Sequence, residues 1–105
     1  KFSDFSQLEI LDINSTKIQS LNTNTFYGLN NLVHLNMNKN KIKIIEKKSF
    51  FGLFYLKILN LKENLIESIE EEILYGLYSL IEFDLSWNKI KIIEKRSFFG
   101  LNNLK

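Results

Sequence analysis

The sequence predicts a repeat solenoid of the α/β type, with a concave parallel β-sheet built from one short strand per 24-residue repeat and an irregular or 3-10 helical convex side. The first observation is that the segment 40–53 returns almost unchanged at 88–101, with Arg96 in place of Lys48. Matching residues also stand halfway between the copies: Asn64, Ile66, Ile69, Gly76 and Leu77. A fixed period of this size is typical of stacked units that cannot bury their apolar faces alone.

Composition is that of an ordinary soluble globular domain. The chain has 105 residues, of which 45% are hydrophobic and 25% charged, so one domain is expected. The formal net charge is +2 and most lysines alternate with glutamates, so no nucleic-acid partner is expected. Cysteine is absent, which excludes disulfides and thiolate metal sites. No apolar run approaches the ~18 residues of a membrane span, and the segment shows no signal-peptide pattern.

Four complete repeats and two partial ones make up a single predicted domain, 1–105. The complete repeats, called repeats 1 to 4 below, span 8–31, 32–55, 56–79 and 80–103. Residues 1–7 are predicted to be the tail of a preceding repeat, because Phe2 aligns with Phe26, and residues 104–105 begin another. Neither end carries a polar cap, so each terminus is expected to expose apolar surface that a further repeat would cover.

Each repeat opens with alternating apolar and polar residues, as in LNMN at 35–38 and LNLK at 59–62. This period of two predicts a short strand with one buried and one wet face. Single strands that recur at this spacing without a hairpin turn must pair in parallel, each return path passing over the far side. A curved solenoid follows.

Two sets of interior residues recur in register behind the strands. Amide side chains follow each strand, where they can donate to and accept from the backbone of adjoining repeats. The predicted ladder consists of Thr16, Asn40, Asn64 and Asn88. Aromatic rings stack behind the sheet, and the predicted spine consists of Phe2, Phe26, Phe50, Leu74 and Phe98. Thr16 and Leu74 depart from these patterns, and repeat 3 is expected to pack less regularly on its convex side.

These positions resemble the leucine-rich repeat family. Repeat 2 carries its pattern of spaced leucines, asparagine, isoleucines and a final F-x-G-L at Leu32, Leu35, Met37, Asn40, Ile42, Ile45, Phe50, Gly52 and Leu53. The 24-residue length is similar to that of the subtype in ectodomains of animal Toll-like receptors, chaoptin-like adhesion proteins and Slit-like ligands. The resemblance covers the whole chain. It implies a leucine-rich repeat horseshoe, an extracellular or cell-surface location, and a role as a receptor ectodomain or in cell adhesion.

The resemblance also implies that the concave strand face binds the partner. Its polar, mixed-charge residues are the predicted partner-binding set: His34, Asn36, Asn60, Lys62, Glu63, Glu82, Asp84 and Trp87. Trp87 is the only tryptophan and is expected to point outward at the rim of this face, where an apolar ring in water favours a partner. The alternative is that the ring folds onto Glu63 and neighbouring aliphatic stems.

No catalytic, cofactor or metal site is predicted, so the chain is not expected to be an enzyme. Glu82 and Asp84 lie two apart on one strand face, as paired carboxylates do in glycosidases, but no closed pocket is indicated that would raise either pKa. Asp12 with Asn36 falls short of the ~6 oxygen ligands that calcium takes. His34 is the only histidine and has no cysteine to join it in a metal site.

The convex side is expected to carry columns of charged and aromatic residues. Charge sign alternates from repeat to repeat in three columns: Lys43, Glu67 and Lys91; Lys47, Glu71 and Lys95; and Lys48, Glu72 and Arg96. Exposed pairs of this kind contribute only ~0 to 1 kcal/mol each, so they fix register more than they stabilise the stack. Beside them an aromatic group offers a lateral contact surface: Tyr27, Phe51, Phe54, Tyr55, Tyr75, Tyr78 and Phe99.

The predicted function is therefore non-catalytic protein recognition or adhesion through the concave face, as part of a longer extracellular protein. The alternative is a structural segment that assembles end to end or side by side into an extended solenoid or filament. A carbohydrate or lipopolysaccharide sensor follows from family analogy alone. Asn14 opens the one N-x-S/T sequon of the chain and is a candidate N-glycosylation site if the protein is secreted.

Overall fold

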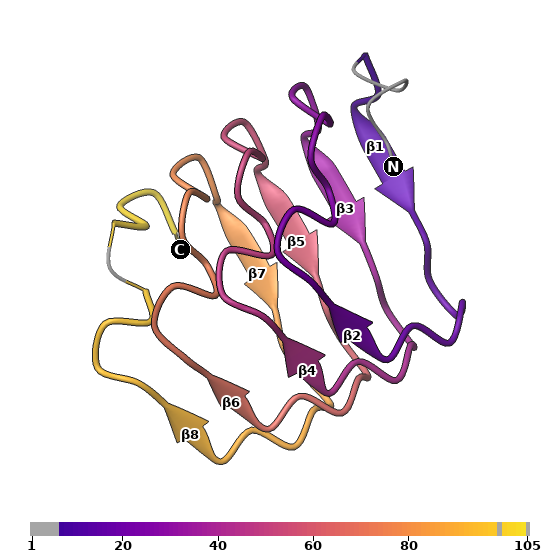
Figure 1. Cartoon of the computed structure of the whole chain (residues 1–105), viewed down its shortest axis with the longest axis vertical. Helices are drawn as coiled ribbons and strands as arrows, with labels where there is room; N and C mark the ends of the chain where they lie inside the picture. The colour runs from indigo at the N-terminus through magenta and orange to yellow at the C-terminus, as the bar shows by residue number, and fades with distance from the viewer. Residues whose placement is uncertain (1–6, 99, 105) are drawn as a thin grey trace.

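The computed structural model describes residues 7–98 and 100–104 and shows a β-solenoid of about four turns (Figure 1). The first row of strands contains β1 (Ile10–Asp12), β3 (His34–Asn36), β5 (Ile58–Asn60) and β7 (Glu82–Asp84). The second row contains β2 (Ser20–Leu21), β4 (Ile44–Ile45), β6 (Ser68–Ile69) and β8 (Ile92–Ile93). Across these described ranges the chain forms no helix. The predicted fold class, a leucine-rich repeat solenoid with a parallel sheet, is confirmed.

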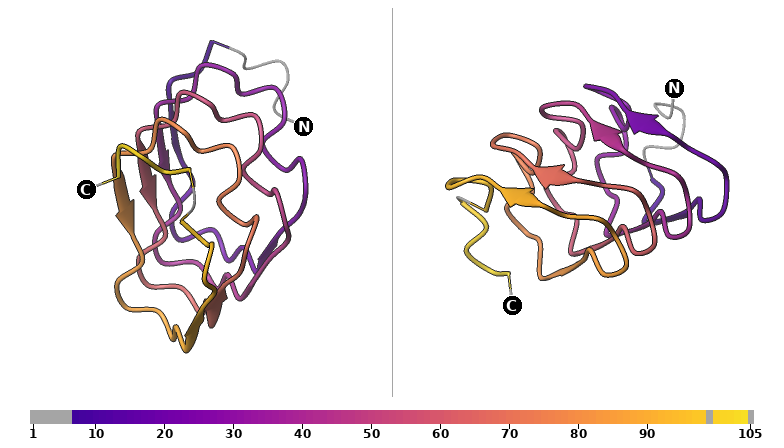
Figure 2. Two further views of the ribbon diagram at one scale, coloured as in Figure 1. Left: turned by 90° about the vertical axis from the view of Figure 1, so that its left-hand side faces the viewer. Right: turned by 90° about the horizontal axis from the view of Figure 1, so that it is seen from below.

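The first row forms the four-stranded parallel sheet, in the order β1-β3-β5-β7. Its register places equivalent residues of successive repeats opposite one another, so that Leu35 pairs with Leu11 on one side and Leu59 on the other. The middle residue of each strand points into the core and the flanking residues face outward, because successive side chains of a strand alternate between faces. Figure 2 shows the coils stacked side by side along the solenoid.

The second row adds short strands that the prediction of an irregular or 3-10 helical convex side did not include. There β2 pairs with β4 and β6 with β8, in parallel, as two separate two-stranded sheets. Their residues lie one period apart, as in the pair Leu21 and Ile45. The strict period brings the backbones of neighbouring repeats within ladder distance here as well, and β-branched isoleucines favour extended backbone. Turns complete each coil between the two rows.

The core fills the space between the two rows of strands. Its fully buried members include Leu35, Leu59, Leu53 and Ile69. Of the predicted spine, Phe26 and Phe50 are buried and stack with ring centroids 5.9 Å apart and planes 6° apart. Leu74 is buried at the equivalent place in repeat 3. Phe2 lies outside the described residues, as do the rest of segment 1–6, Phe99 and Lys105.

Phe98, the last spine position, packs in a different way from Phe50. Its ring meets Phe83 edge-on, with centroids 6.3 Å apart and planes 62° apart. Phe83 stands in β7 where the other strands carry leucine, and its ring packs against the buried core to which Leu74 belongs. The aromatic stack is therefore interrupted at repeat 3 and resumes as a different pair.

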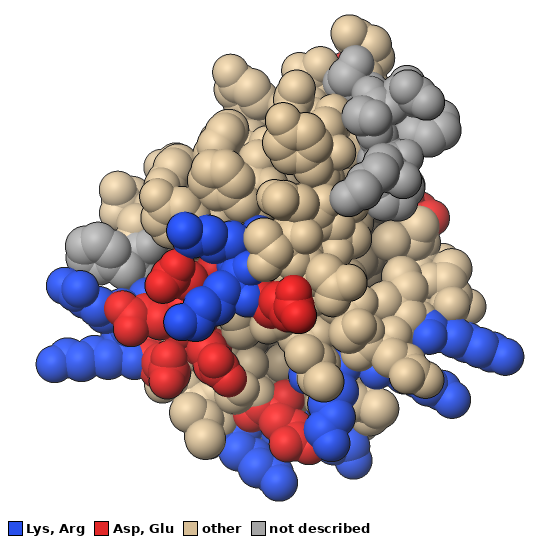
Figure 3. Space-filling view, in the orientation of Figure 1, with Lys and Arg blue, Asp and Glu red and all other residues tan. Residues whose placement is uncertain are grey.

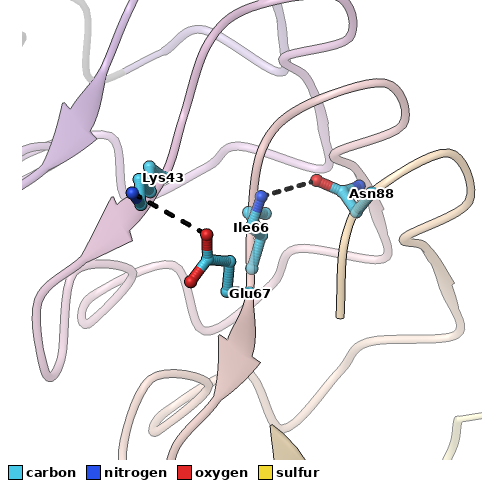
Figure 4. A network of polar contacts seen from close by, with 4 residues as sticks. All are labelled: Lys43, Ile66, Glu67 and Asn88. Carbon is cyan, nitrogen blue, oxygen red and sulfur yellow. Dashed lines mark hydrogen bonds and ion pairs between the residues drawn. The ribbon is translucent and has the colours of Figure 1, made fainter. Parts of the chain in front are cut away.

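The ladder amides connect neighbouring repeats. The Asn64 side chain donates from Nδ2 to the carbonyls of Met37 and Leu61, both at 3.0 Å, and accepts at Oδ1 from the amide of Ile42 at 3.0 Å. Asn88 repeats this arrangement and accepts from the amide of Ile66 at 3.0 Å (Figure 4). A buried backbone group left without such a partner costs about 1 to 3 kcal/mol.

Thr16 takes the first ladder position without an amide. Its hydroxyl donates to the carbonyl of Ile13 at 2.9 Å, three residues earlier, which is the same short-range bond that Asn64 makes to Leu61. Its own backbone amide donates to Oδ1 of Asn40 at 2.8 Å. Thr16 is exposed, whereas Asn40 and Asn64 are buried. The hydroxyl thus replaces the bond within the repeat, and it also lies 3.0 Å from Oδ1 of Asn40 in the next repeat.

A second hydrogen-bonded position lies beside the spine. Ser49 is buried and its hydroxyl donates to the carbonyls of Glu46 at 2.6 Å and Leu21 at 3.2 Å. The buried Ser97 donates in the same way to Ile69. Repeat 3 has Ile73 here, buried against the core, so one apolar side chain replaces a link between repeats.

Charged side chains of successive repeats pair on the surface. Lys43 lies 3.7 Å from Glu67 (Figure 4), and Lys48 lies 3.8 Å from Glu72. In the view of Figure 3 acidic side chains lie among basic ones over the lower half of the molecule, and few of the described residues in the upper half are charged. Both pairs are well exposed, so each contributes at most about 1 kcal/mol.

Candidate functional site

The concave sheet brings the predicted partner-binding residues into ordered columns. His34 pairs with Ile10 and Ile58, and Glu82 completes that column. Asn36, Asn60 and Asp84 form the next column together with Asp12. Since adjacent parallel strands lie ~4.8 Å apart, side chains of one column are close neighbours. Five of the predicted residues, His34, Asn36, Asn60, Glu82 and Asp84, therefore share the outer face of the sheet, and Lys62, Glu63 and Trp87 follow directly after its strands.

The column that begins at Asp12 also shapes the backbone beyond each strand. One side-chain oxygen of each member accepts a hydrogen bond from the backbone amide two residues on: Asp12 from Asn14 at 3.2 Å, Asn36 from Asn38 at 3.1 Å, Asn60 from Lys62 at 3.0 Å, and Asp84 from Ser86 at 2.9 Å. This is an Asx turn, in which the side chain holds the chain as a backbone turn would. One oxygen of each of these side chains is thus already engaged in a hydrogen bond within its own repeat.

Directly after these turns a left-handed residue occurs in every repeat. Ser15, Lys39, Glu63 and Trp87 have φ angles of 57°, 55°, 58° and 58°. Residues other than glycine, asparagine and aspartate seldom adopt this region, and a bulky side chain does so at a cost. The Asx turn before it and the ladder amide after it hold the backbone in place. Sequence reasoning missed this role, although the Asp or Asn three positions before each left-handed residue was a usable signal.

Trp87 is the most exposed large apolar residue of the described chain, at 77%. The sequence left open whether the ring points outward or folds onto Glu63, and the structure shows it outward. The residue combines a left-handed backbone with an apolar ring in water, and neither feature stabilises the fold. Glu63, the preceding member of its column, is also exposed.

The side chains around Trp87 have mixed charge. Asp84 and Ser86 lie on the same turn, joined by a hydrogen bond from the Ser86 hydroxyl to the carboxylate at 2.6 Å. The two hydrogen bonds from Ser86, first from its side chain and then from its backbone, lower the pKa of Asp84, and Lys62 adds a smaller attraction. The carboxylate is therefore held in its charged form, whereas a general acid needs a raised pKa. Glu82 and Asp84 are both exposed.

Asn14, the sequon residue, is exposed at the rim of the concave face in repeat 1. It stands one period before Asn38 and two before Lys62, in the concave column next to that of Trp87. Asn14 in repeat 1 and Trp87 in repeat 4 therefore lie toward opposite ends of the concave face.

Across residues 7–98 and 100–104 no group of three or more His, Asp or Glu side chains is placed to hold a metal ion. Over the same range no helix has the length and apolar character needed to cross a membrane.

Comparisons with known proteins agree with this architecture. A family model described as Leucine rich repeat matches residues 6–61 and 54–105. No curated protein matches the chain. Among solved structures 63 chains match, including a crystal structure of a TLR13-ssRNA13 complex with 36% sequence identity and a TM-score of 0.94. That match covers 99% of this chain and 15% of the TLR13 chain, so this chain spans about a seventh of that protein's length.

Proposed function

Because the chain belongs to the leucine-rich repeat family, whose members bind protein partners, we propose that this segment binds a protein through its concave sheet as part of a longer extracellular receptor or adhesion protein. The curved parallel sheet is rigid and preformed, so little rearrangement accompanies binding. Leucine-rich repeat solenoids are generally non-catalytic, and the segment acts by recognition alone.

Trp87 is the observation that carries this proposal. Aromatic anchors contribute most of the binding free energy of many interfaces, and they lie beside polar residues that exclude water. Trp87 has such neighbours in Glu63, Asp84 and Ser86, on turns fixed by hydrogen bonds. The anchor is therefore preorganised, which reduces the entropy lost on binding.

A protein partner suits this face better than a polyanion. The concave residues include Glu63, Glu82 and Asp84 against Lys62 and Lys39, so the sheet offers no continuous basic track for phosphates. The TLR13 structure contains a single-stranded RNA. A chain of such low net charge would depend on stacking against Trp87 for any similar contact. Single-stranded RNA is therefore the informative competitor in a binding test.

The test uses Trp87 as its own reporter, since it is the only tryptophan. A set of secreted and cell-surface ectodomains is screened for binding, with a single-stranded RNA included, and each hit is titrated against intrinsic fluorescence. A blue-shifted emission, with binding weakened at least tenfold in Trp87→Ala, is the expected result. Tyr55→Ala, an exposed aromatic change outside the concave sheet, should bind like the parent.

Two outcomes would contradict the proposal. One is a protein partner whose affinity is the same for the parent and Trp87→Ala while Tyr55→Ala weakens it, because the concave face would then not be the site. The other is an emission shift with RNA alone and with none of the ectodomains, because the partner class would then be nucleic acid.

The proposed extracellular location has a separate test at Asn14. Its exposure allows a glycan to be attached if the chain passes through a secretory pathway. We expect secreted material from eukaryotic cells to carry a glycan that Asn14→Gln removes, seen by intact-mass measurement. The glycan would cover the concave face at repeat 1 and leave the Trp87 end open. Unmodified Asn14 in secreted protein would remove this support.

A further inference from the structure

Four exposed aromatic residues form a compact cluster outside the concave sheet, called the aromatic quartet here: Phe51, Phe54, Tyr75 and Tyr78. Within each repeat the two rings meet edge-on, with centroids 5.4 Å apart for Phe51 and Phe54 and 6.3 Å apart for Tyr75 and Tyr78. Between repeats the rings stack nearly parallel, with centroids 5.7 Å apart for Phe51 and Tyr75 and 6.3 Å for Phe54 and Tyr78. The quartet is therefore a two-by-two array across repeats 2 and 3.

The rings of the array pack against one another although they face solvent. Its members are between 36% and 48% exposed. Gly76 has a φ of 95° and lies under the array, where a Cβ atom would approach Phe51 Cδ1 to 3.3 Å. The sequence thus provides a glycine where the ring of the neighbouring repeat needs room. Packed rings that keep more than a third of their surface in water form an apolar patch of the kind found at interfaces.

Opposite charges border the quartet on one side. Lys48 in repeat 2 and Glu72 in repeat 3 occupy equivalent positions, and the Lys48 ammonium lies 5.3 Å from the centroid of the Tyr75 ring. The preceding column shows the same order, with Lys47 in repeat 2 and Glu71 in repeat 3. Repeat 2 is thus positive and repeat 3 negative along this border, and the line between them passes through the middle of the quartet.

We propose that the quartet is a docking surface for a second copy of this chain, related by a two-fold axis that lies in the contact plane along the line between repeats 2 and 3. This operation places repeat 2 of one copy on repeat 3 of the other. Phe51 then faces Tyr75 of the second copy and Phe54 faces its Tyr78. Lys48 faces Glu72 of the second copy, and the reciprocal pair forms by symmetry. Such an interface is isologous and closes as a dimer.

The pattern of charges favours a second copy over an unrelated protein. A two-fold contact needs a surface that is complementary to itself, and reversal of charge across the axis provides that property. A partner with a uniform acidic or basic face would meet one favourable and one repelling half. The array is also matched in shape across the axis, because each ring of repeat 2 has a stacked equivalent in repeat 3.

Charge-reversed variants test this geometry directly. In Lys48→Glu both positions of the border are acidic, and in Glu72→Lys both are basic, so each variant alone should repel its own copy. Mixing the two variants restores opposite charges across the axis on both sides. Sedimentation velocity over a concentration series should show a monomer–dimer equilibrium for the parent. The dissociation constant should rise about tenfold or more for each variant alone, with an approach to the parental value for the mixture.

Two further variants separate the quartet from general apolar exposure. Phe54→Ser in the quartet should weaken the dimer at least tenfold. Ile10→Ser, an exposed apolar residue on the concave β1 strand, should leave it unchanged. Circular dichroism on each variant establishes that the fold is retained. A parent that stays monomeric up to about 1 mM protein would overturn the proposal. The proposal would also be overturned if the mixture of the two charge variants formed no more dimer than each variant alone. Oligomers larger than the dimer, formed to the same extent by the parent and the variants, would overturn it as well.

Discussion

Residues 40–53 and 88–101 have the same sequence at all positions but one, yet they lie in different environments. Phe50 is fully buried and stacked on Phe26, whereas Phe98 is half-buried and meets Phe83 edge-on. Among the aliphatic residues the same difference appears, since Ile93 is 55% exposed and its counterpart Ile45 is half-buried. Local sequence therefore does not set the environment of these side chains.

The neighbouring repeats account for the difference. Repeat 2 packs between repeats 1 and 3 in this chain, and its strand β3 pairs on both sides. Repeat 4 packs on repeat 3 through β7 and β8. In a solenoid each unit contacts only its neighbours, so stability is approximately a sum of repeat and interface contributions. Matched substitutions in the two copies can measure the interface contribution, because the surrounding sequence is nearly the same in both copies and its effect cancels in the comparison.

The largest expected difference is at the spine. Phe50→Ala should lower the free energy of unfolding by about 3 to 5 kcal/mol, because it opens a cavity at a fully buried site. Phe98→Ala should cost less, since its ring is partly in water already. Urea denaturation of both variants and the parent measures the two costs. Equal costs would mean that the stacking environment does not decide the effect.

The ladder should show a smaller difference of the same sign. Asn40→Ala removes bonds to repeat 1 and within repeat 2 at a buried site, at a cost of about 1 to 3 kcal/mol. Asn88→Ala removes the equivalent bonds at a half-buried site, where water can replace part of them. We expect the Asn40 variant to melt first in urea. The reverse order would contradict the assigned role of burial.

At the serine position the two copies should behave alike, which provides an internal control. Ser49 and Ser97 are both buried and both donate to a carbonyl of the preceding repeat. Serine to alanine should cost about 1 kcal/mol in either copy. Differential scanning calorimetry on the two variants should give the same shift in Tm. A clear difference between the two shifts in Tm would show that position in the chain, rather than burial, controls the loss of stability.

The smallest expected difference is between two Asx turns, the one that Asp84 forms after β7 and the one that Asn60 forms after the interior strand β5. The hydrogen bonds from Ser86 lower the folded-state pKa of Asp84 below its ordinary value of 3.8. Their contribution to stability is complete above that ordinary value and is lost as the pH falls through the lower folded pKa. An NMR titration should show the Asp84 pKa rising in Ser86→Ala. Asn60 does not titrate, so the turn in β5 should keep its chemical shifts over the same range.

Much of the fold was accessible from sequence because the 24-residue period fixes which residues are neighbours. The parallel sheet and its register follow from that period and from the alternation at each repeat start. The second row of strands was missed, since two-residue strands such as β4 carry too little pattern to be read. The left-handed turn before each ladder residue was missed because Lys39, Glu63 and Trp87 do not favour that conformation locally.

The candidate sites were less accessible than the fold. An exposed tryptophan could be inferred from its column, but its orientation depended on the turn that Asp84 and Ser86 hold. The sequence predicted an aromatic lateral surface that includes all four residues of the quartet, but it did not single them out from Tyr27, Tyr55 and Phe99. The two-by-two geometry of the quartet and its register with Lys48 and Glu72 required ring positions. Periodicity predicts which backbone positions are adjacent, and tertiary packing decides how side chains meet.

The most direct test of the central claim, that stacked neighbours rather than local sequence set each residue's environment, is amide hydrogen exchange at Ile42 and Ile90. Both lie in the segment NKIKIIE, so their intrinsic exchange rates are equal. The amide of Ile42 donates to the buried Asn64 side chain at 3.0 Å, and Ile42 is fully buried while Ile90 is half-buried. We predict that Ile42 exchanges more slowly, by on the order of tenfold or more. Equal rates at the two amides, or slower exchange at Ile90, would contradict the account.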